Sequence, residues 1–465
     1  MAVIRHIGLN AINGPLVFLD NVENAAFDEL VEIVVNNKQT RQGKIVKIEG
    51  KKVVIEVFEG TNNLSLSNTK INFTGEPLKM PLSTEMIGRI FNGSCKPIDG
   101  FGEIFVEKYE DINGSAINPI SRVYPKNFIE TGISAIDALS TLIRGQKLPI
   151  FSDAGLPHNK LAVQIVNQAK IVDTNEKDNF CIVFAAMGVK NDVADYFKTK
   201  FEESGILKNV VMFLNLSNDP IIERILTPRA ALTAAEYLAF EKNMHVLVIL
   251  TDMTSYAEAV REISSSKGEI PGRKGFPGYL YSDLAQIYER AGVLKSSKGS
   301  LTQIPILTMP NGDITNPVPD LTGYITEGQI VLSKELNKRG IYPPIAILPS
   351  LSRLMKDGIG EGFTRKDHKD LANQLFASYA KVQEIKSLAS VIGEEKLSEI
   401  DKAYIKFGKE FEEKFITQNL NENRTIKQTL NLGWNLLALL PKKELDRIDT
   451  KILDESYEEP HKTQI

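Results

Sequence analysis

The chain has 465 residues, of which 42% are hydrophobic and 25% charged, and its net charge at pH 7 is −4. This size allows about two to four domains, and the slight acidic excess argues against a nucleic-acid partner. Two distant cysteines, Cys95 and Cys181, argue against a disulfide framework and are typical of reduced thiols. The start lacks the pattern of a signal peptide, and no apolar run reaches the ~18–20 residues of a membrane span. We therefore expect a cytoplasmic protein with no direct membrane span.

The first domain is predicted to consist of short strands. Segments 28–35, 42–49 and 51–58 alternate apolar and polar side chains, as half-buried strands do. The tripeptide Glu49-Gly50-Lys51 predicts a tight hairpin. Because closure removes exposed strand edges, we expect a small β-barrel over residues 1–75.

Residues 76–352 show a different pattern, in which apolar strands alternate with helices. Strands buried on both faces are expected at 181–187, 210–216 and 246–250. Helices are expected at 192–203 and 227–242. Such alternation predicts βαβ units and a mostly parallel sheet. The proline-containing stretch 311–319 is interpreted as a surface loop.

Helical periodicity replaces the strand pattern over residues 353–465. Apolar side chains recur every three or four positions over 371–388 and again over 400–415, which predicts one apolar stripe on each helix. Thr425 and Gln428 have the spacing of a capping box. A C-terminal helical bundle is therefore predicted.

One segment near the middle of the chain has the outline of a phosphate-binding loop without the residues that bind phosphate. A working loop reads G-x-x-x-x-G-K-[ST]: glycines bring backbone N–H groups to the phosphates, the lysine reaches the terminal phosphates, and the hydroxyl holds Mg²⁺. Here Ser152 replaces the first glycine and Pro157, which has no N–H, the second. His158 replaces the lysine and Asn159 the Ser/Thr, while Asp153 adds an anion where a phosphate would lie. We predict that this loop does not bind a nucleotide.

Two positions at the ends of predicted strands bear on hydrolysis. Asp252 ends an apolar run, where P-loop enzymes place an acid that helps to hold Mg²⁺; without the loop lysine and hydroxyl, we favour the alternative of a strand-end Asp that caps the next turn. ATPases of this architecture carry a general base just after such a strand, but Gly188 is followed by Val189, which cannot take a proton. Nearby Asp192 is interpreted as a helix N-cap.

Several long segments resemble the α and β chains of rotary ATPases. They are 128–137 (FIETGISAID), 271–291 (PGRKGFPGYLYSDLAQIYERA), 299–302 (GSLT) and 322–330 (TGYITEGQI). Residues 156–159 (LPHN) and 348–353 (LPSLSR) resemble more specifically the V-type B subunit, the non-catalytic β chain. The resemblance spans nearly the whole chain and implies a RecA-like, P-loop-type central domain between the barrel and the bundle. One departure is Ala346, where the family signature usually has Asp, Asn or His.

The resemblance implies a role for Arg353. In rotary ATPases, the non-catalytic chain extends an arginine across the subunit interface toward the phosphates bound by its catalytic neighbour. A guanidinium there neutralises charge on the transferring phosphoryl group and donates a planar fork of hydrogen bonds. Taken alone, an arginine after Ser-Leu-Ser is more often solvated or salt-bridged, and the matched motif favours the trans role. Arg273, between glycines, is expected either to contact the neighbour or the central rotor, or to be a solvated loop charge.

The resemblance also implies partners and cofactors. It predicts a regulatory, non-catalytic subunit of a V-type or archaeal-type ATPase/ATP synthase that alternates with catalytic A subunits in an A3B3 ring and contacts central and peripheral stalk subunits. ATP or ADP with Mg²⁺ would lie at the interface, bound mainly by the partner chain, and rotation would couple its chemistry to H⁺ or Na⁺ transport. The alternative is a pseudo-ATPase scaffold in which Arg353 is incidental; a stand-alone ATPase would need an intact loop. The five histidines lack metal-ligand spacing, so no metal site is expected.

Overall fold

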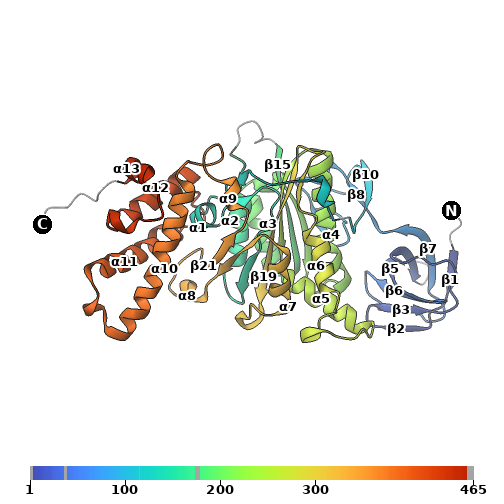
Figure 1. Ribbon diagram of the computed structural model, residues 1–465. Helices are drawn as coiled ribbons and strands as arrows, with labels where there is room; N and C mark the ends of the chain where they lie inside the picture. Colours follow the sequence, from blue (N-terminus) through green and yellow to red (C-terminus); the bar gives the residue numbers. More distant parts are fainter. Residues whose placement is uncertain (1–3, 36–38, 115, 173–178, 458–465) are drawn as a thin grey trace.

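The computed structural model describes residues 4–35, 39–114, 116–172 and 179–457. A β-barrel, a central α/β domain and a helical C-terminal domain follow one another along an elongated molecule, in chain order (Figure 1). The β-barrel and the C-terminal helices therefore lie at opposite ends of the molecule. The predicted fold class is confirmed.

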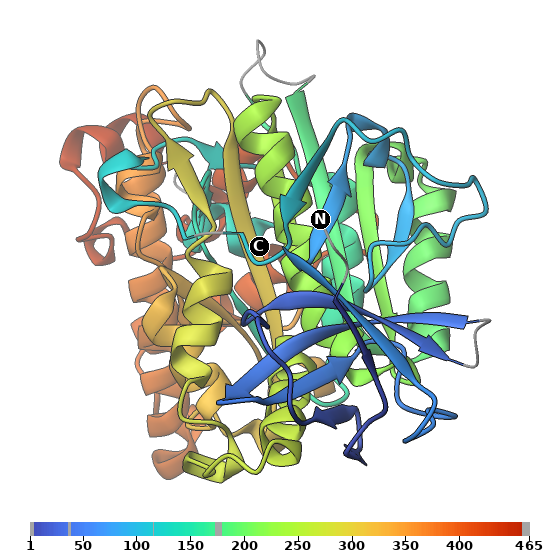
Figure 2. The ribbon, with the colours of Figure 1, turned by 90° about the vertical axis from the view of Figure 1, so that its right-hand side faces the viewer.

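The barrel is an antiparallel seven-stranded sheet in the order β1-β7-β4-β5-β6-β3-β2, and in Figure 2 it faces the viewer. Its strands are β1 (Ile4–Ile7), β2 (Ala11–Asn13), β3 (Leu16–Leu19), β4 (Glu29–Val35), β5 (Gln39–Glu49), β6 (Lys52–Val57) and β7 (Lys70–Pro77). Alternate side chains of β4 are buried, which is the expected period of a half-buried strand. Glu49 pairs with Lys52 across the predicted hairpin, and Gly50 at its tip has a φ of 61°.

The central domain is built on a ten-stranded sheet whose principal order is β21-β20-β14-β19-β17-β15-β16-β9. These strands are β9 (Ile90–Asn92), β14 (Ile150–Asp153), β15 (Phe180–Val189), β16 (Val210–Leu216), β17 (His245–Thr251), β19 (Ser300–Met309), β20 (Gly328–Leu332) and β21 (Ile345–Ser352). Neighbours from β20 to β9 are parallel, and β21 joins the edge antiparallel to β20. Shorter strands complete the domain: β8 (Lys79–Leu82), β10 (Lys108–Asp111), β11 (Arg122–Val123), β12 (Phe128–Ile129), β13 (Leu142–Ile143) and β18 (Gly292–Leu294).

Helices cover both faces of this sheet. They are α1 (Ser134–Leu139), α2 (His158–Gln168), α3 (Asn191–Glu203), α4 (Ile221–Glu236), α5 (Met253–Ser266), α6 (Leu280–Tyr288), α7 (Pro317–Ile325) and α8 (Lys334–Lys338). Alternate residues of β15 enter different apolar clusters: Phe184 packs with the α3 side, and Val183 with the α4 and α5 side. Burial on both faces explains why this strand is apolar without interruption.

Two local predictions in this domain are wrong. The stretch 311–319 is not a loop throughout, because α7 begins at Pro317 with Asn316 as its cap. Proline suits the first turn of a helix, where its missing N–H needs no partner. Asp192 is not an N-cap: α3 begins one residue earlier, after Lys190, and Asp192 lies within the first turn, where its charge favours the helix dipole.

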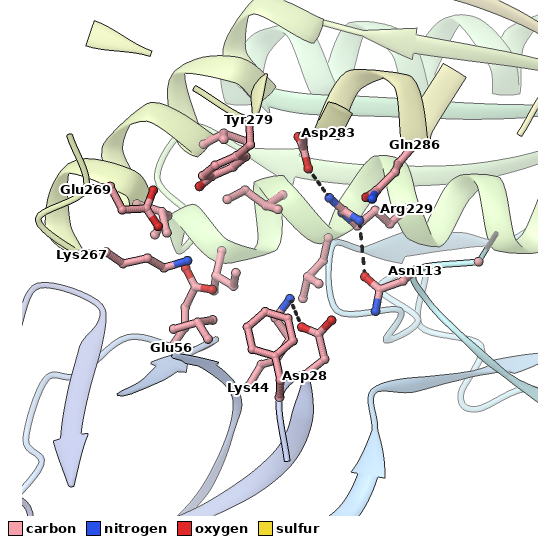
Figure 3. A pocket seen from close by; sticks show the side chains of 18 of the residues that line it. Asp28, Lys44, Glu56, Asn113, Arg229, Lys267, Glu269, Tyr279, Asp283 and Gln286 are labelled. Atoms are coloured by element: carbon pink, nitrogen blue, oxygen red, sulfur yellow. Dashed lines mark hydrogen bonds and ion pairs between the residues drawn. The ribbon is translucent and has the colours of Figure 1, made fainter. Parts of the chain in front are cut away.

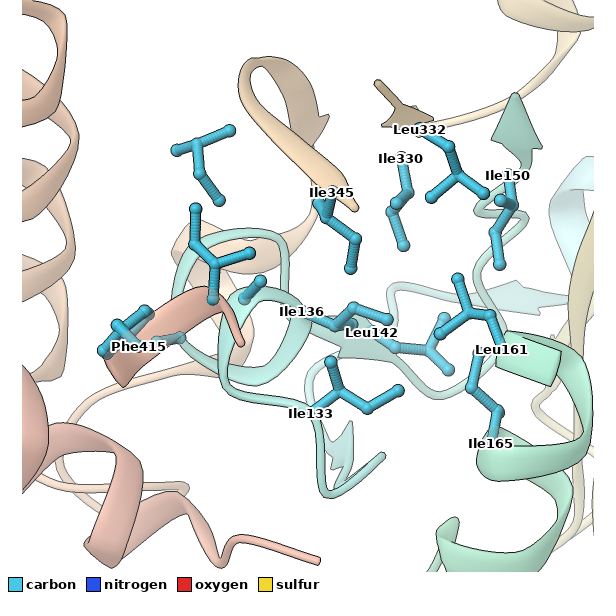
Figure 4. Close-up of a cluster of buried hydrophobic side chains, with 14 of the residues drawn as sticks. Ile133, Ile136, Leu142, Ile150, Leu161, Ile165, Ile330, Leu332, Ile345 and Phe415 are labelled. Atoms are coloured by element: carbon cyan, nitrogen blue, oxygen red, sulfur yellow. The ribbon is translucent and has the colours of Figure 1, made fainter. Parts of the chain in front are cut away.

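The C-terminal domain contains α9 (Met355–Gly358), α10 (His368–Ile392), α11 (Glu399–Glu410), α12 (Ile426–Leu437) and α13 (Thr450–Ser456). The predicted capping box of Thr425 and Gln428 is present at the start of α12. Ile136 of α1, Ile345 of β21 and Phe415, just beyond α11, belong to one buried cluster (Figure 4). This domain therefore shares its core with the central sheet. No helix in the described part of the chain has the length and apolarity needed to cross a membrane.

Candidate functional site

The degenerate loop lies between β14 and α2, at the carboxyl edge of the parallel sheet. This edge is where open α/β sheets bind their ligands. Pro157 is the residue before α2, and it makes no side-chain cap. Since proline also has no N–H to offer, the first turn of α2 is poorly equipped to receive a phosphate.

The position of the phosphate-binding lysine holds a histidine that is fixed within the loop. The Ser152 hydroxyl and Nδ1 of His158 are hydrogen-bonded at 2.9 Å. Burial lowers the pKa of His158 and outweighs the nearby charge of Asp252, so the ring is neutral at pH 7. Asn159 is half-buried, and its side chain makes no hydrogen bond to any described residue. The loop therefore supplies neither a cation nor a hydroxyl for Mg²⁺.

The Asp153 carboxylate does not stand free in the loop. Its Oδ2 atom lies 2.5 Å from Nζ of Lys334 in α8, and its Oδ1 accepts the Ala154 N–H at 2.7 Å. The one acid in the loop is thus neutralised by a neighbouring element.

Asp252 is fully used as a structural cap. Oδ1 accepts the N–H groups of Thr254 at 2.9 Å and Thr308 at 3.1 Å, and Oδ2 accepts the Thr308 hydroxyl at 2.5 Å. The favoured interpretation as a strand-end cap is confirmed, because Asp252 is the N-cap of α5. The described residues contain no cluster of three or more His, Cys, Asp or Glu side chains that could hold a metal ion.

Arg353 lies immediately after β21, at the edge of the sheet, and its side chain is exposed. Its backbone N–H donates to the carbonyl of Glu327 at 3.0 Å. Among the residues that the structure describes, its guanidinium has neither a hydrogen bond nor an ion pair. An exposed cation on a fixed backbone is available to an anionic group outside this chain.

The residue whose carbonyl accepts the Arg353 N–H is Glu327, and its carboxylate is paired with a different cation, Lys147. The Glu327 carboxylate accepts Nζ of the buried Lys147 at 2.7 Å and the Lys147 N–H at 2.9 Å. Lys147 also pairs with Glu289, at 2.9 Å. Sequence reasoning missed this cluster, although Glu327 stands within the quoted segment TGYITEGQI.

Arg273 is held by neighbouring residues within the chain. It forms an ion pair with Asp320 of α7 at 3.1 Å and donates to the Thr315 carbonyl at 2.7 Å. Its charge is therefore already balanced within the chain, in contrast to that of Arg353.

A cavity of about 760 Å³ lies between the barrel and the central domain (Figure 3). Two ion pairs line it, Lys44 with Asp28 at 3.1 Å and Arg229 with Asp283 at 2.6 Å. The buried Glu56 also lines it, and burial raises the pKa of this carboxyl. The cavity is remote in sequence from both the degenerate loop and Arg353, and no motif predicted it.

Three family models match the chain. The β-barrel domain of the ATP synthase alpha/beta family matches residues 10–75, and the nucleotide-binding domain of that family matches residues 132–352. The C-terminal domain of V and A type ATP synthase matches residues 357–457.

Curated relatives and a solved structure are similar over nearly the full length. The V-type ATP synthase beta chain 2 of Clostridium tetani is 60% identical, covering 97% of this chain and 98% of its own length. The V-type ATP synthase beta chain of Thermotoga neapolitana is 57% identical over 100% of both chains. The ATP synthase subunit NeqB from Nanoarcheaum equitans is 42% identical with a TM-score of 0.73, covering 92% of this chain and 100% of that one.

Proposed function

Because this chain belongs to the family of V-type ATP synthase beta chains, we propose that it is the non-catalytic, regulatory subunit of its complex and that Arg353 completes an ATP site on a neighbouring subunit. The observation that carries the proposal is the exposed guanidinium of Arg353 at the sheet edge, which has no partner among the described residues, in a chain whose own loop has lost its phosphate ligands. The catalytic A subunit then supplies the loop that binds the nucleotide.

The chain's own residues do not fit a bound nucleotide. Pro157 offers no N–H, and His158 is neutral and hydrogen-bonded to Ser152, so the loop presents no cation to a phosphate. This arrangement supports a subunit that does not hydrolyse ATP on its own.

Arg353 fits the phosphates of a nucleotide held by another chain. In hydrolysis the γ-phosphoryl group of Mg-ATP would pass to water and leave ADP, and in synthesis phosphate would be joined to ADP with loss of water. The guanidinium cannot deprotonate and can bind two oxygens at once, so it stabilises the charge that develops on the transferring group. In other phosphoryl-transfer enzymes an arginine in this role contributes ~10³–10⁵ in kcat.

The proposed setting is an A3B3 ring in which this chain alternates with A subunits around central stalk subunits, with peripheral stalk subunits outside. Nucleotide chemistry at the interfaces is coupled by rotation to the transport of H⁺ or Na⁺, and the chain is peripheral to the membrane through the complex, on its cytoplasmic side. The names of the relatives support a multisubunit ATP synthase. We propose that the chain has three domains: the β-barrel over residues 1–75, the nucleotide-binding-like α/β domain over 76–352 and the helical domain over 353–465.

The test is steady-state ATP hydrolysis by the reconstituted complex with Arg353→Ala. We expect kcat to fall by about 10³-fold or more while nucleotide binding is largely kept. The control is Lys356→Ala, which removes another exposed cation three residues away, in α9, and should leave kcat near wild type. Unchanged turnover in the Arg353 variant would leave only the scaffold alternative.

A further inference from the structure

We propose that Gln146 is the positioning residue for Arg353, an inference that rests on the proposed function. Gln146 lies in the turn between β13 and β14 and is fully buried. Its Nε2 atom donates to the carbonyl of Glu327 at 2.9 Å and to the hydroxyl of Ser352 at 2.8 Å. These acceptors lie on the two chain segments that meet at Arg353.

The two segments form a tight corner. The Glu327 carbonyl that accepts from Gln146 also accepts the Arg353 N–H, at 3.0 Å. Ser352, directly before Arg353, pairs with Gly328, directly after Glu327. A Cβ at Gly328 would clash with the Leu351 carbonyl, so only glycine allows this approach. One amide group therefore fixes both sides of the corner from which Arg353 extends.

The amide of Gln146 is itself fixed by the rest of the domain. Its Oε1 atom accepts the Ile143 N–H at 2.9 Å, and its backbone carbonyl accepts the Gln303 N–H of β19 at 2.9 Å. A buried side chain with its donor and acceptor sites engaged has one low-energy orientation. Gln146 thus holds the backbone at Arg353 in a fixed position relative to the central sheet.

This anchoring matters because the Arg353 side chain has no partner among the residues that the structure describes. A long, unpaired side chain loses rotamer freedom when it meets its target, and a displaced backbone would add to that cost. Misplacement of a catalytic group by ~1 Å costs about 10²-fold in rate. Gln146 acts through Arg353 and touches no reacting atom.

The test compares Gln146→Met with Gln374→Met in the reconstituted complex. Methionine keeps the length of glutamine and removes its hydrogen bonds. Gln374 of α10 is a matched control, because it is also buried and its Nε2 likewise donates to a hydroxyl, that of Ser378 at 3.0 Å, and to a carbonyl, that of Glu444 at 3.2 Å, within the C-terminal domain. We expect Gln146→Met to lower kcat by about 10–100-fold with KM little changed, and Gln374→Met to stay near wild type. Equal losses in the two variants would overturn the inference.

A double-mutant cycle separates positioning from general packing. In a complex that already carries Arg353→Ala, Gln146→Met should cause no further loss of kcat, because the group it positions is gone. Losses that multiply would overturn the inference.

Ser352→Ala removes only one of the two acceptors of Gln146, so it should lower kcat by a smaller factor than Gln146→Met. This variant tests the corner even if the complex with Gln146→Met fails to assemble. An unchanged kcat in the Ser352 variant would count against the inference. If Arg353→Ala leaves kcat unchanged, the proposed function fails. If Arg353→Ala lowers kcat but Gln146→Met and Ser352→Ala do not, only the positioning inference fails.

Discussion

His158 lies at the loop position of the phosphate-binding lysine and Arg353 at the edge of the sheet, and their surroundings differ. His158 is held by Ser152 inside the loop, where burial lowers its pKa and keeps it neutral. Arg353 is exposed and unpaired within the described chain, so its guanidinium N–H donors are available to a group outside it. A neutral histidine in the loop and an available arginine at the sheet edge are consistent with a subunit that acts on its neighbour's nucleotide.

The isolated chain should therefore bind nucleotide weakly at best and hydrolyse none. Without a loop lysine, a second glycine or a Mg²⁺ hydroxyl, the N-terminus of α2 alone gives little binding free energy. Isothermal titration calorimetry with Mg-ATP on the purified chain checks this, with the assembled complex as the positive control. Tight, Mg²⁺-dependent binding to the chain alone would show that the loop has been misinterpreted.

At the scale of single elements, strong periodicity predicted strands and helices well, whereas signals for element ends were correct at one helix start and wrong at others. The apolar run 210–216 coincides with β16, and the capping box placed the start of α12 correctly. The start of α7 was missed because prolines at 317 and 319 are typical of loops, although both fall in a first turn where no N–H is required. Element ends depend on one or two caps, whereas their interiors depend on many side chains.

Between elements, His368 at the start of α10 links the C-terminal domain to α1. Its Nε2 is hydrogen-bonded to the Ala138 carbonyl and its Nδ1 to the Thr364 hydroxyl, each at 3.0 Å. Both ring nitrogens are thus satisfied by the neutral imidazole, and burial lowers the pKa of His368 from 6.5 to about 4.

This shift predicts a stability that falls as the pH is lowered. Between about pH 6.5 and pH 4, His368 binds a proton in the unfolded state but not in the folded state. The free energy of unfolding therefore decreases as the pH falls through that window and levels off below it. A shift of this size corresponds to about 3 kcal/mol. Chemical denaturation of the wild type and His368→Gln over this range measures it. A pH dependence that is identical in the two proteins would contradict the assignment.

At the scale of the whole molecule, the candidate site was only partly predictable. The degenerate loop is local, so its lost ligands could be identified from the sequence. The Gln146 network joins residues 181 and 206 positions apart, and no spacing rule predicts such contacts. Whether the Arg353 guanidinium has a partner within the described residues depends on all the elements that surround it, which the sequence does not show. Its role was inferred only through the resemblance, and its mounting at a corner between the sheet and the C-terminal domain required the structure.

The central claim is that a neighbouring subunit binds the nucleotide while this chain supplies Arg353. The most direct test of it is the rate of the chemical step in a single turnover. Steady-state turnover also includes product release and rotation, whereas a single turnover of bound Mg-ATP isolates hydrolysis. Comparing wild type, Arg353→Ala and Arg353→Lys in the reconstituted complex, we predict a fall of about 10³–10⁵-fold for the alanine variant. The lysine variant should be intermediate, because it keeps a charge but loses the planar fork. A wild-type rate of hydrolysis in the alanine variant would contradict the account.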